Sequence, residues 1–192
     1  MSQTSFWQQL KNVVGDGTAV ASSTSQTSLL TGSPGASDGV YKLNGGTLQV
    51  NSELLIRAGG RVSTQAAGGG TLTFTVKIGS VNALVSQAMA TNATAQTNQT
   101  WWLEIHATCR QVGSVAQCLL MWTGRFESRA VVGSGAAGST GVGALLIPET
   151  APAVGTGFDS TIDNAIDLQS TWSVNNASYS IQLHQYSLSL KN

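Results

Sequence analysis

The segment "WWLEIHATCRQVGSVAQCLLMWTGRFE", residues 101–127, contains three of the five tryptophans and both cysteines of the chain. A histidine, two thiols and nearby carboxylates could form a metal site or a catalytic centre. Structural zinc takes about four Cys or His ligands at short spacings, whereas eight residues separate Cys109 from Cys118. In a strand, His106 also points to the opposite face from the cysteines. We therefore predict neither a metal nor a cofactor.

A hairpin explains this segment as core. If Gly113 and Ser114 form a two-residue turn, residues whose numbers sum to 227 lie opposite each other, so that Cys109 meets Cys118 on an apolar face. A disulfide between the two cysteines is possible at such a site, while synthesis in the cytosol favours two reduced, buried thiols. The sequence leaves both states open.

Other motifs do not indicate catalysis. "GSGAAG" at 133–138 matches a phosphate-binding glycine pattern, but the helix that this pattern requires does not follow it. Asp159, Asp163 and Asp167 recur every four residues, yet the residues between them do not favour the helix that would bring three carboxylates together. No serine lies in a G-x-S-x-G elbow. We expect a protein that is not an enzyme.

Charge is sparse and balanced. Nine basic and nine acidic residues make up 9% of the chain, and no basic cluster occurs, which argues against nucleic acid as a partner. No apolar run approaches the roughly 18 residues that cross a bilayer, so we expect no membrane contact. The N-terminus has no basic, apolar signal pattern, which predicts synthesis in the cytoplasm.

Most of the chain alternates with a period of two. In "TLTFTVKI", Leu72, Phe74, Val76 and Ile78 share one face and polar residues the other, as in a half-buried antiparallel strand. Similar segments separated by glycine-rich turns predict an all-β fold, a jelly-roll-like antiparallel β-sandwich over residues 18–192. The alternation changes phase near His184 and Gln185, which indicates a bulge or a crossing between sheets.

Residues 1–17 are predicted to form an N-terminal arm, helical or extended. Within "SFWQQLKNVV", apolar residues at spacings of three and four favour a short amphipathic helix that ends at "GDG". A helix this short needs a surface to pack on. The residues expected to engage a capsid or a neighbouring subunit are Phe6, Trp7, Leu10 and Val14.

Several segments together resemble a known class. These are "SFWQQLKNVVGDGTAV", the strands "TWWLEI" and "GRFES", and the ending "IQLHQYSLSL"; they resemble capsid decoration, or cement, proteins of tailed bacteriophages, particularly phages of cyanobacteria. The resemblance implies a jelly-roll or tumour-necrosis-factor-like homotrimer on the outer capsid surface of the virion. Its implied partners are the major capsid protein and further copies of itself.

Two aromatic residues are candidate anchors of a subunit interface. Trp102 and Tyr186 share strands with core residues but have the opposite parity, and aromatic side chains are favoured at interfaces.

Two other classes of protein stay open. One is a receptor- or glycan-binding module of a tail fibre or spike, and the other a carbohydrate-active jelly-roll enzyme, which would need two converging carboxylates.

Overall fold

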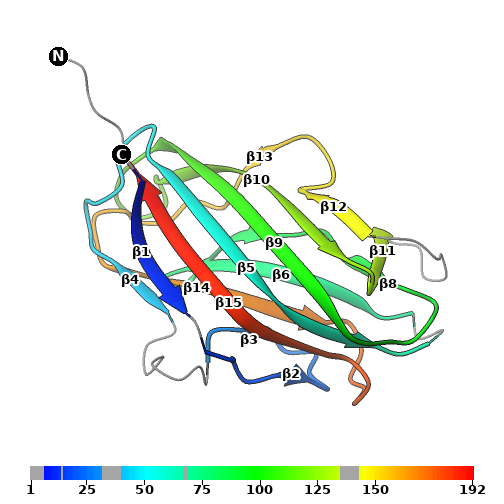
Figure 1. The fold of residues 1–192 in the computed structure, drawn as a ribbon. Helices are drawn as coiled ribbons and strands as arrows, with labels where there is room; N and C mark the ends of the chain where they lie inside the picture. Colours follow the sequence, from blue (N-terminus) through cyan, green and yellow to red (C-terminus); the bar gives the residue numbers. More distant parts are fainter. Residues whose placement is uncertain (1–6, 14, 32–39, 67–68, 135–142) are drawn as a thin grey trace.

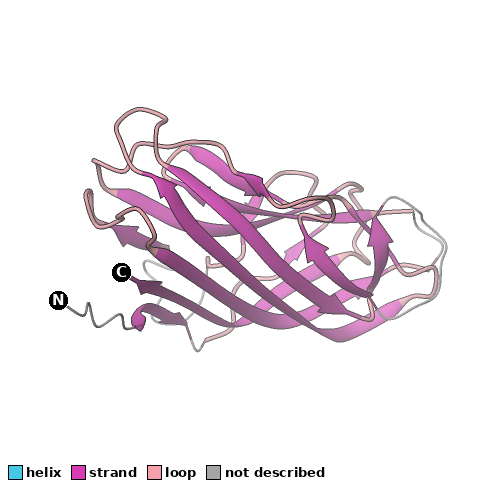
Figure 2. Ribbon diagram, turned by 90° about the horizontal axis from the view of Figure 1, so that it is seen from above, coloured by secondary structure: helices cyan, strands magenta, loops and turns pink. Residues whose placement is uncertain are grey.

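The protein is a sandwich of two antiparallel β-sheets (Figures 1 and 2). The computed structural model describes residues 7–13, 15–31, 40–66, 69–134 and 143–192. All described regular structure is strand, and no helix that could span a membrane occurs in these ranges. The predicted all-β sandwich is confirmed.

The larger sheet has eight strands. Its main order is β1 (Trp7–Val13), β15 (Ser180–Lys191), β5 (Glu53–Thr64), β9 (Gln96–Gln111), β10 (Leu119–Ser128) and β12 (Gly143–Ile147). Two short strands join it at the sides, where β2 (Val20–Ala21) pairs with β15 and β13 (Ala153–Val154) pairs with β10.

The smaller sheet has seven strands. Its main order is β11 (Val131–Ser134), β8 (Met89–Thr91), β6 (Thr71–Ile78), β14 (Asn164–Trp172) and β3 (Thr27–Ser28). Two further strands complete it, since β4 (Tyr41–Leu43) pairs with β14 and β7 (Val81–Val85) pairs with β6.

The connections are those of a jelly roll. The chain crosses between sheets from β5 to β6, from β8 to β9 and from β14 to β15. The last strand, β15, lies between β1 and β5, while β14 lies between β6 and the early strands β3 and β4. Strands that are distant in sequence thus become neighbours, as in the double Greek key of this fold.

Aromatic rings fill the space between the sheets. Phe74 of the smaller sheet lies 5.8 Å from the ring of Trp101 and 5.0 Å from that of Phe126, both in the larger sheet. The four apolar residues of the "TLTFTVKI" strand are all buried, as predicted. Tilted aromatic contacts of this kind add to the stabilisation that burial of apolar surface gives.

The predicted register of the β9–β10 hairpin is wrong by two residues. The strands are joined by residues 112–118 rather than by a two-residue turn, and opposite residues sum to 229, so that Cys109 faces Leu120. Cys118 instead exchanges two backbone hydrogen bonds with Phe158. A shift by two residues keeps every side chain on its predicted face, and therefore both cysteines are still in the core.

The disulfide left open by the sequence is not formed in the structure. Cys109 and Cys118 are free, fully buried thiols. Burial raises the pKa of Cys109 and raises that of Cys118 to about 12. Both cysteines therefore behave as small apolar core residues with little thiolate character.

Of the helical and extended forms left open for the arm, the extended one is found over Trp7–Val13, which forms strand β1 at the edge of the larger sheet, so the helix that the apolar spacing favoured is wrong there. Pairing with β15 supplies the backbone hydrogen bonds that a short helix could not keep in water. A bulge between Gln9 and Lys11 lets Leu10 pack partly against the core. Phe6 and Val14 lie outside the described residues.

Tyr186 is a core residue, so its predicted role in a subunit interface is wrong. Of the bulge and the sheet crossing that the sequence left open, the bulge is present in β15, between Leu183 and Gln185, and it reverses the alternation of the strand. Tyr179, Ile181 and Leu183 before the bulge and Tyr186 after it consequently face the same interior. Parity counted across the bulge placed Tyr186 on the wrong face.

The buried hydroxyl of Tyr186 gives a test of this packing. The hydroxyl has no hydrogen-bond partner among the described residues, and burial raises the pKa of Tyr186. Tyr186→Phe should therefore leave the free energy of unfolding unchanged or raise it by up to about 1 kcal/mol. Tyr186→Ala should lower it by roughly 3–5 kcal/mol, because it leaves a cavity. Denaturant unfolding measures both, and a large loss in Tyr186→Phe would contradict the assignment.

Candidate binding face on the larger sheet

The two sheets present different chemistry to solvent. Strands of the larger sheet carry nine of the eighteen charged residues, whereas strands of the smaller sheet carry three. The nine are Lys11, Glu53, Arg57, Arg61, Glu104, Arg110, Arg125, Glu127 and Lys191. Both histidines and two part-exposed tryptophans, Trp7 and Trp102, also lie in the larger sheet. Charged side chains, the histidines and these two tryptophans are thus concentrated in the larger sheet of the sandwich.

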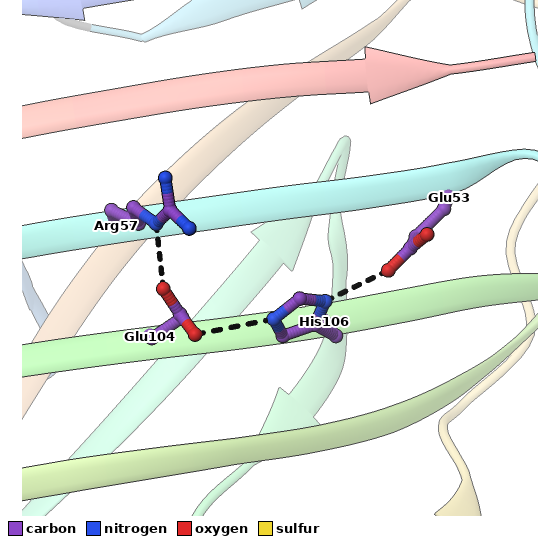
Figure 3. Close-up of polar contacts among 4 residues, drawn as sticks. All are labelled: Glu53, Arg57, Glu104 and His106. Carbon is purple, nitrogen blue, oxygen red and sulfur yellow. Dashed lines mark hydrogen bonds and ion pairs between the residues drawn. The ribbon is translucent and has the colours of Figure 1, made fainter. Parts of the chain in front are cut away.

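A row of four charged side chains, which we call the charged row, crosses strands β5 and β9 (Figure 3). His106 contacts Glu53 through Nδ1 at 2.8 Å and Glu104 through Nε2 at 3.2 Å. The Nε of Arg57 donates to the other carboxylate oxygen of Glu104 at 2.6 Å. Both ring nitrogens of His106 can donate only when the imidazole is protonated, so the arrangement favours the charged form.

The charge states of His106 and Glu104 in the charged row follow from their contacts. Burial works against a charged His106, but the hydrogen bonds to Glu53 and Glu104 outweigh it and raise the pKa of the imidazole. The hydrogen bond from Arg57 holds the pKa of Glu104 below its ordinary value. The four residues therefore form alternating opposite charges under mildly acidic conditions.

A pocket of about 370 Å³ opens beside the charged row, between β1, β15, β5 and β9. Its polar wall consists of Asn12, Arg57, His184, Gln185 and Ser187. The indole of Trp102, 39% exposed, supplies its main apolar surface. Arg57 belongs both to the pocket and to the charged row, and it joins the two features.

Two glycines and the bulge shape the pocket. Gly59 lies opposite Trp102, and a Cβ at Gly59 would approach the indole carbon Cε3 to 3.2 Å. A Cβ at Gly60 would lie only 2.0 Å from the carbonyl oxygen of Gln182. Glycine at these positions therefore lets the ring rest against the sheet and lets β15 bulge next to it. The bulge also directs His184 toward Asp16, whose Oδ1 lies 2.5 Å from the imidazole Nδ1.

Sequence reasoning placed Trp102 correctly on the outer face but missed the rest of the pocket. The prediction that Trp102 anchors a subunit interface stays a prediction. The contributions of Asn12 and Arg57 depend on pairing between distant strands, and no local pattern reveals them. The glycine pair inside an otherwise alternating strand, together with the phase change at His184, was the available signal.

The three regularly spaced aspartates do not form a cation site. Asp159 accepts hydrogen bonds from Thr161, and Asp163 pairs with Lys42. Asp167 accepts from Ser28. In the part of the chain that the structure describes, no group of three or more His, Cys, Asp or Glu residues could hold a metal ion.

Comparison with known proteins gives no family. No family model and no curated protein matches the chain. Among solved structures, the chain is similar to the CBM2 module of the evolved Dit of Lactobacillus casei BL23 phage J-1, with 11% identity and a TM-score of 0.37. The match covers 98% of this chain and 97% of that one. A TM-score this low supports no conclusion about function.

The His106 contacts predict a measurable titration. The pKa of His106, followed by the imidazole proton signals in NMR, should exceed the ordinary value of 6.5. Glu53→Gln should lower it, since an amide oxygen stabilises the imidazolium less than a carboxylate does. The chain has two histidines, so His106→Gln identifies the signal.

The shifted pKa of His106 also makes the free energy of unfolding depend on pH. A raised folded-state pKa means that His106 stabilises the fold below its unfolded pKa and loses this contribution as pH rises through the folded value. The lowered pKa of Glu104 has the opposite dependence, and its contribution is lost in acid. Because the side chains of His106 and Glu104 are partly exposed, solvent screening keeps the contribution of each to the free energy of unfolding at about 0.5 kcal/mol. An unchanged titration of His106 in Glu53→Gln would contradict the contacts.

Proposed function

We propose that the chain is a non-catalytic structural protein of a tailed-bacteriophage virion. In this proposal it coats the outer capsid surface as a homotrimer and braces neighbouring major capsid subunits. Support comes from the resemblance of its terminal and β9–β10 segments to decoration proteins, and from a jelly-roll sandwich of the kind that the resemblance implies. Neither a cofactor, a nucleic acid nor a membrane is part of this function.

The observation that carries the proposal is an exposed apolar edge, formed by Val85, Leu146 and Val154. These side chains are 53%, 69% and 44% exposed. Val85 and Val154 line a single hollow of about 210 Å³, and the carbonyl of Leu146 accepts a hydrogen bond from Gln87, two residues beyond Val85. Grouped exposed apolar side chains mark protein contacts.

The apolar edge is suited to contact between copies of the chain. It lies where β12 and β13 border the larger sheet and where β7 borders the smaller one, on the side away from β1. Sheet borders expose backbone groups and apolar side chains together, and association covers both. A nearly neutral chain also offers little electrostatic repulsion between copies.

Strand β1 supports a separate contact with the capsid. Trp7 is 43% exposed, and the ammonium of Lys191 lies 5.8 Å from the centre of its ring. Leu10, by contrast, packs partly against the core. Trp7 is therefore the described arm residue with the most apolar surface to offer, while Leu10 holds the strand in place.

Oligomeric state tests the proposal. Analytical ultracentrifugation of the wild-type chain should show a trimer, and Leu146→Asp and Val154→Asp should shift it to monomer by placing charges in the contact. Ile162→Asp is the matched control, because Ile162 is 56% exposed outside the apolar edge and should leave the trimer intact. A monomeric wild-type chain, or a trimer unaffected by both edge variants, would overturn the proposed contact.

A recognition module of a tail fibre or spike is the second candidate. The pocket beside Trp102 favours it, because host recognition requires an exposed site with both apolar and hydrogen-bonding surface. The two candidates share the fold and differ in where the chain sits on the virion.

A further inference from the structure

We propose that the pocket beside Trp102 is a saccharide-binding site. The proposal goes beyond capsid decoration and does not depend on it, since a capsid protein and a tail module would expose the same pocket. Its ligand class follows from three properties of the pocket: a flat indole, unpaired hydrogen-bonding groups and compensated charge.

The indole provides the apolar part of the site. Trp102 is held against the backbone of Gly59, and 39% of its surface is exposed beside the polar wall. Pyranose rings have one face of C–H groups, which packs on a flat aromatic ring. Aromatic contact adds favourable energy beyond the area that it buries.

The surrounding polar groups supply the second part. Among the described residues, the side chains of Asn12, Gln185 and Ser187 and the indole N–H of Trp102 line the pocket without a hydrogen bond to another described residue. The same holds for the two terminal guanidinium nitrogens of Arg57, which bonds Glu104 through Nε. Donors and acceptors thus surround the exposed indole, as sugar hydroxyls require.

Charge compensation disfavours an anion. Arg57 is paired with Glu104, and His184 contacts Asp16, so each of these two basic side chains of the pocket has a carboxylate beside it. A wholly apolar ligand would leave the amide and hydroxyl groups of the wall without partners, which is costly. A neutral ligand with one apolar face and many hydroxyls satisfies both conditions. The pocket volume of about 370 Å³ lies within the range of small-molecule sites.

Indole N–H signals give a direct test. The chain has five tryptophans, so a ¹⁵N-labelled sample shows five indole signals, and Trp102→Phe identifies that of Trp102. Glucose, galactose, mannose, N-acetylglucosamine, lactose, maltose and cellobiose are titrated singly. At least one should shift the Trp102 signal saturably, with a dissociation constant of about 1 mM, while the signal of Trp7 stays in place.

Variants connect the shift to the pocket. Isothermal titration of the responding sugar should show binding about tenfold weaker in Trp102→Ala, which removes the aromatic contact. Gly59→Ala keeps the indole but displaces it, and should weaken binding as well. Trp7→Phe, an exposed tryptophan outside the pocket, should bind like the wild type. Melting curves verify that each variant is folded.

The proposal would be overturned by no shift with any of the seven sugars, by parallel shifts of Trp7 and Trp102, or by unchanged affinity in folded Trp102→Ala. Sedimentation of Trp102→Ala separates the site from a subunit contact. Loss of the trimer would assign Trp102 to an interface and contradict the saccharide site. Failure of the apolar-edge variants to dissociate the trimer would instead affect only the proposed function.

Discussion

The antiparallel pairing of β5 with β9 on one side and β15 on the other is the constraint on which the rest of the structure depends. The three strands are 12, 16 and 12 residues long and form the centre of the larger sheet. One face of this ladder carries Trp101, Ile56 and Leu188 into the core. The other carries Arg57, Glu104 and Trp102 outward, so core and candidate site are opposite faces of the same pairing.

The bulge in β15 shapes both the core and the candidate site. The bulge between Leu183 and Gln185 turns Tyr186 inward, where it completes the core, and it opens the pocket between β1 and the exposed indole of Trp102. Gly59 and Gly60 lie opposite the bulge and allow this close approach of backbones. Bulges next to binding sites commonly serve to redirect side chains in this way.

The sequence could predict most of the fold because a period of two is a local signal. The strand at 71–78, the inward direction of both cysteines and an irregularity near His184 followed from alternation, although the sequence left open whether that irregularity was a bulge or a crossing between sheets. The hairpin register could not be predicted as well, since Gly113–Ser114 resembles a tight turn while the actual loop is fixed by pairing of Cys118 with the distant Phe158. The helical spacing in the arm was overridden by an open sheet edge at β15. For the site, Trp102 was accessible to sequence reasoning, whereas its neighbours Asn12 and Arg57 are brought there only by long-range pairing.

The proposed surfaces divide the molecule in a way that suits an assembly. The apolar edge at β7, β12 and β13 is assigned to other copies, Trp7 of β1 to the capsid, and the pocket between them to a small ligand. Under the proposal of a tailed-bacteriophage virion protein, cryo-electron microscopy of virions that carry the chain tests the central claim most directly. The account predicts trimeric density with the jelly-roll shape on the outer capsid surface. Density for the chain at the tail, or none on the capsid, would contradict it.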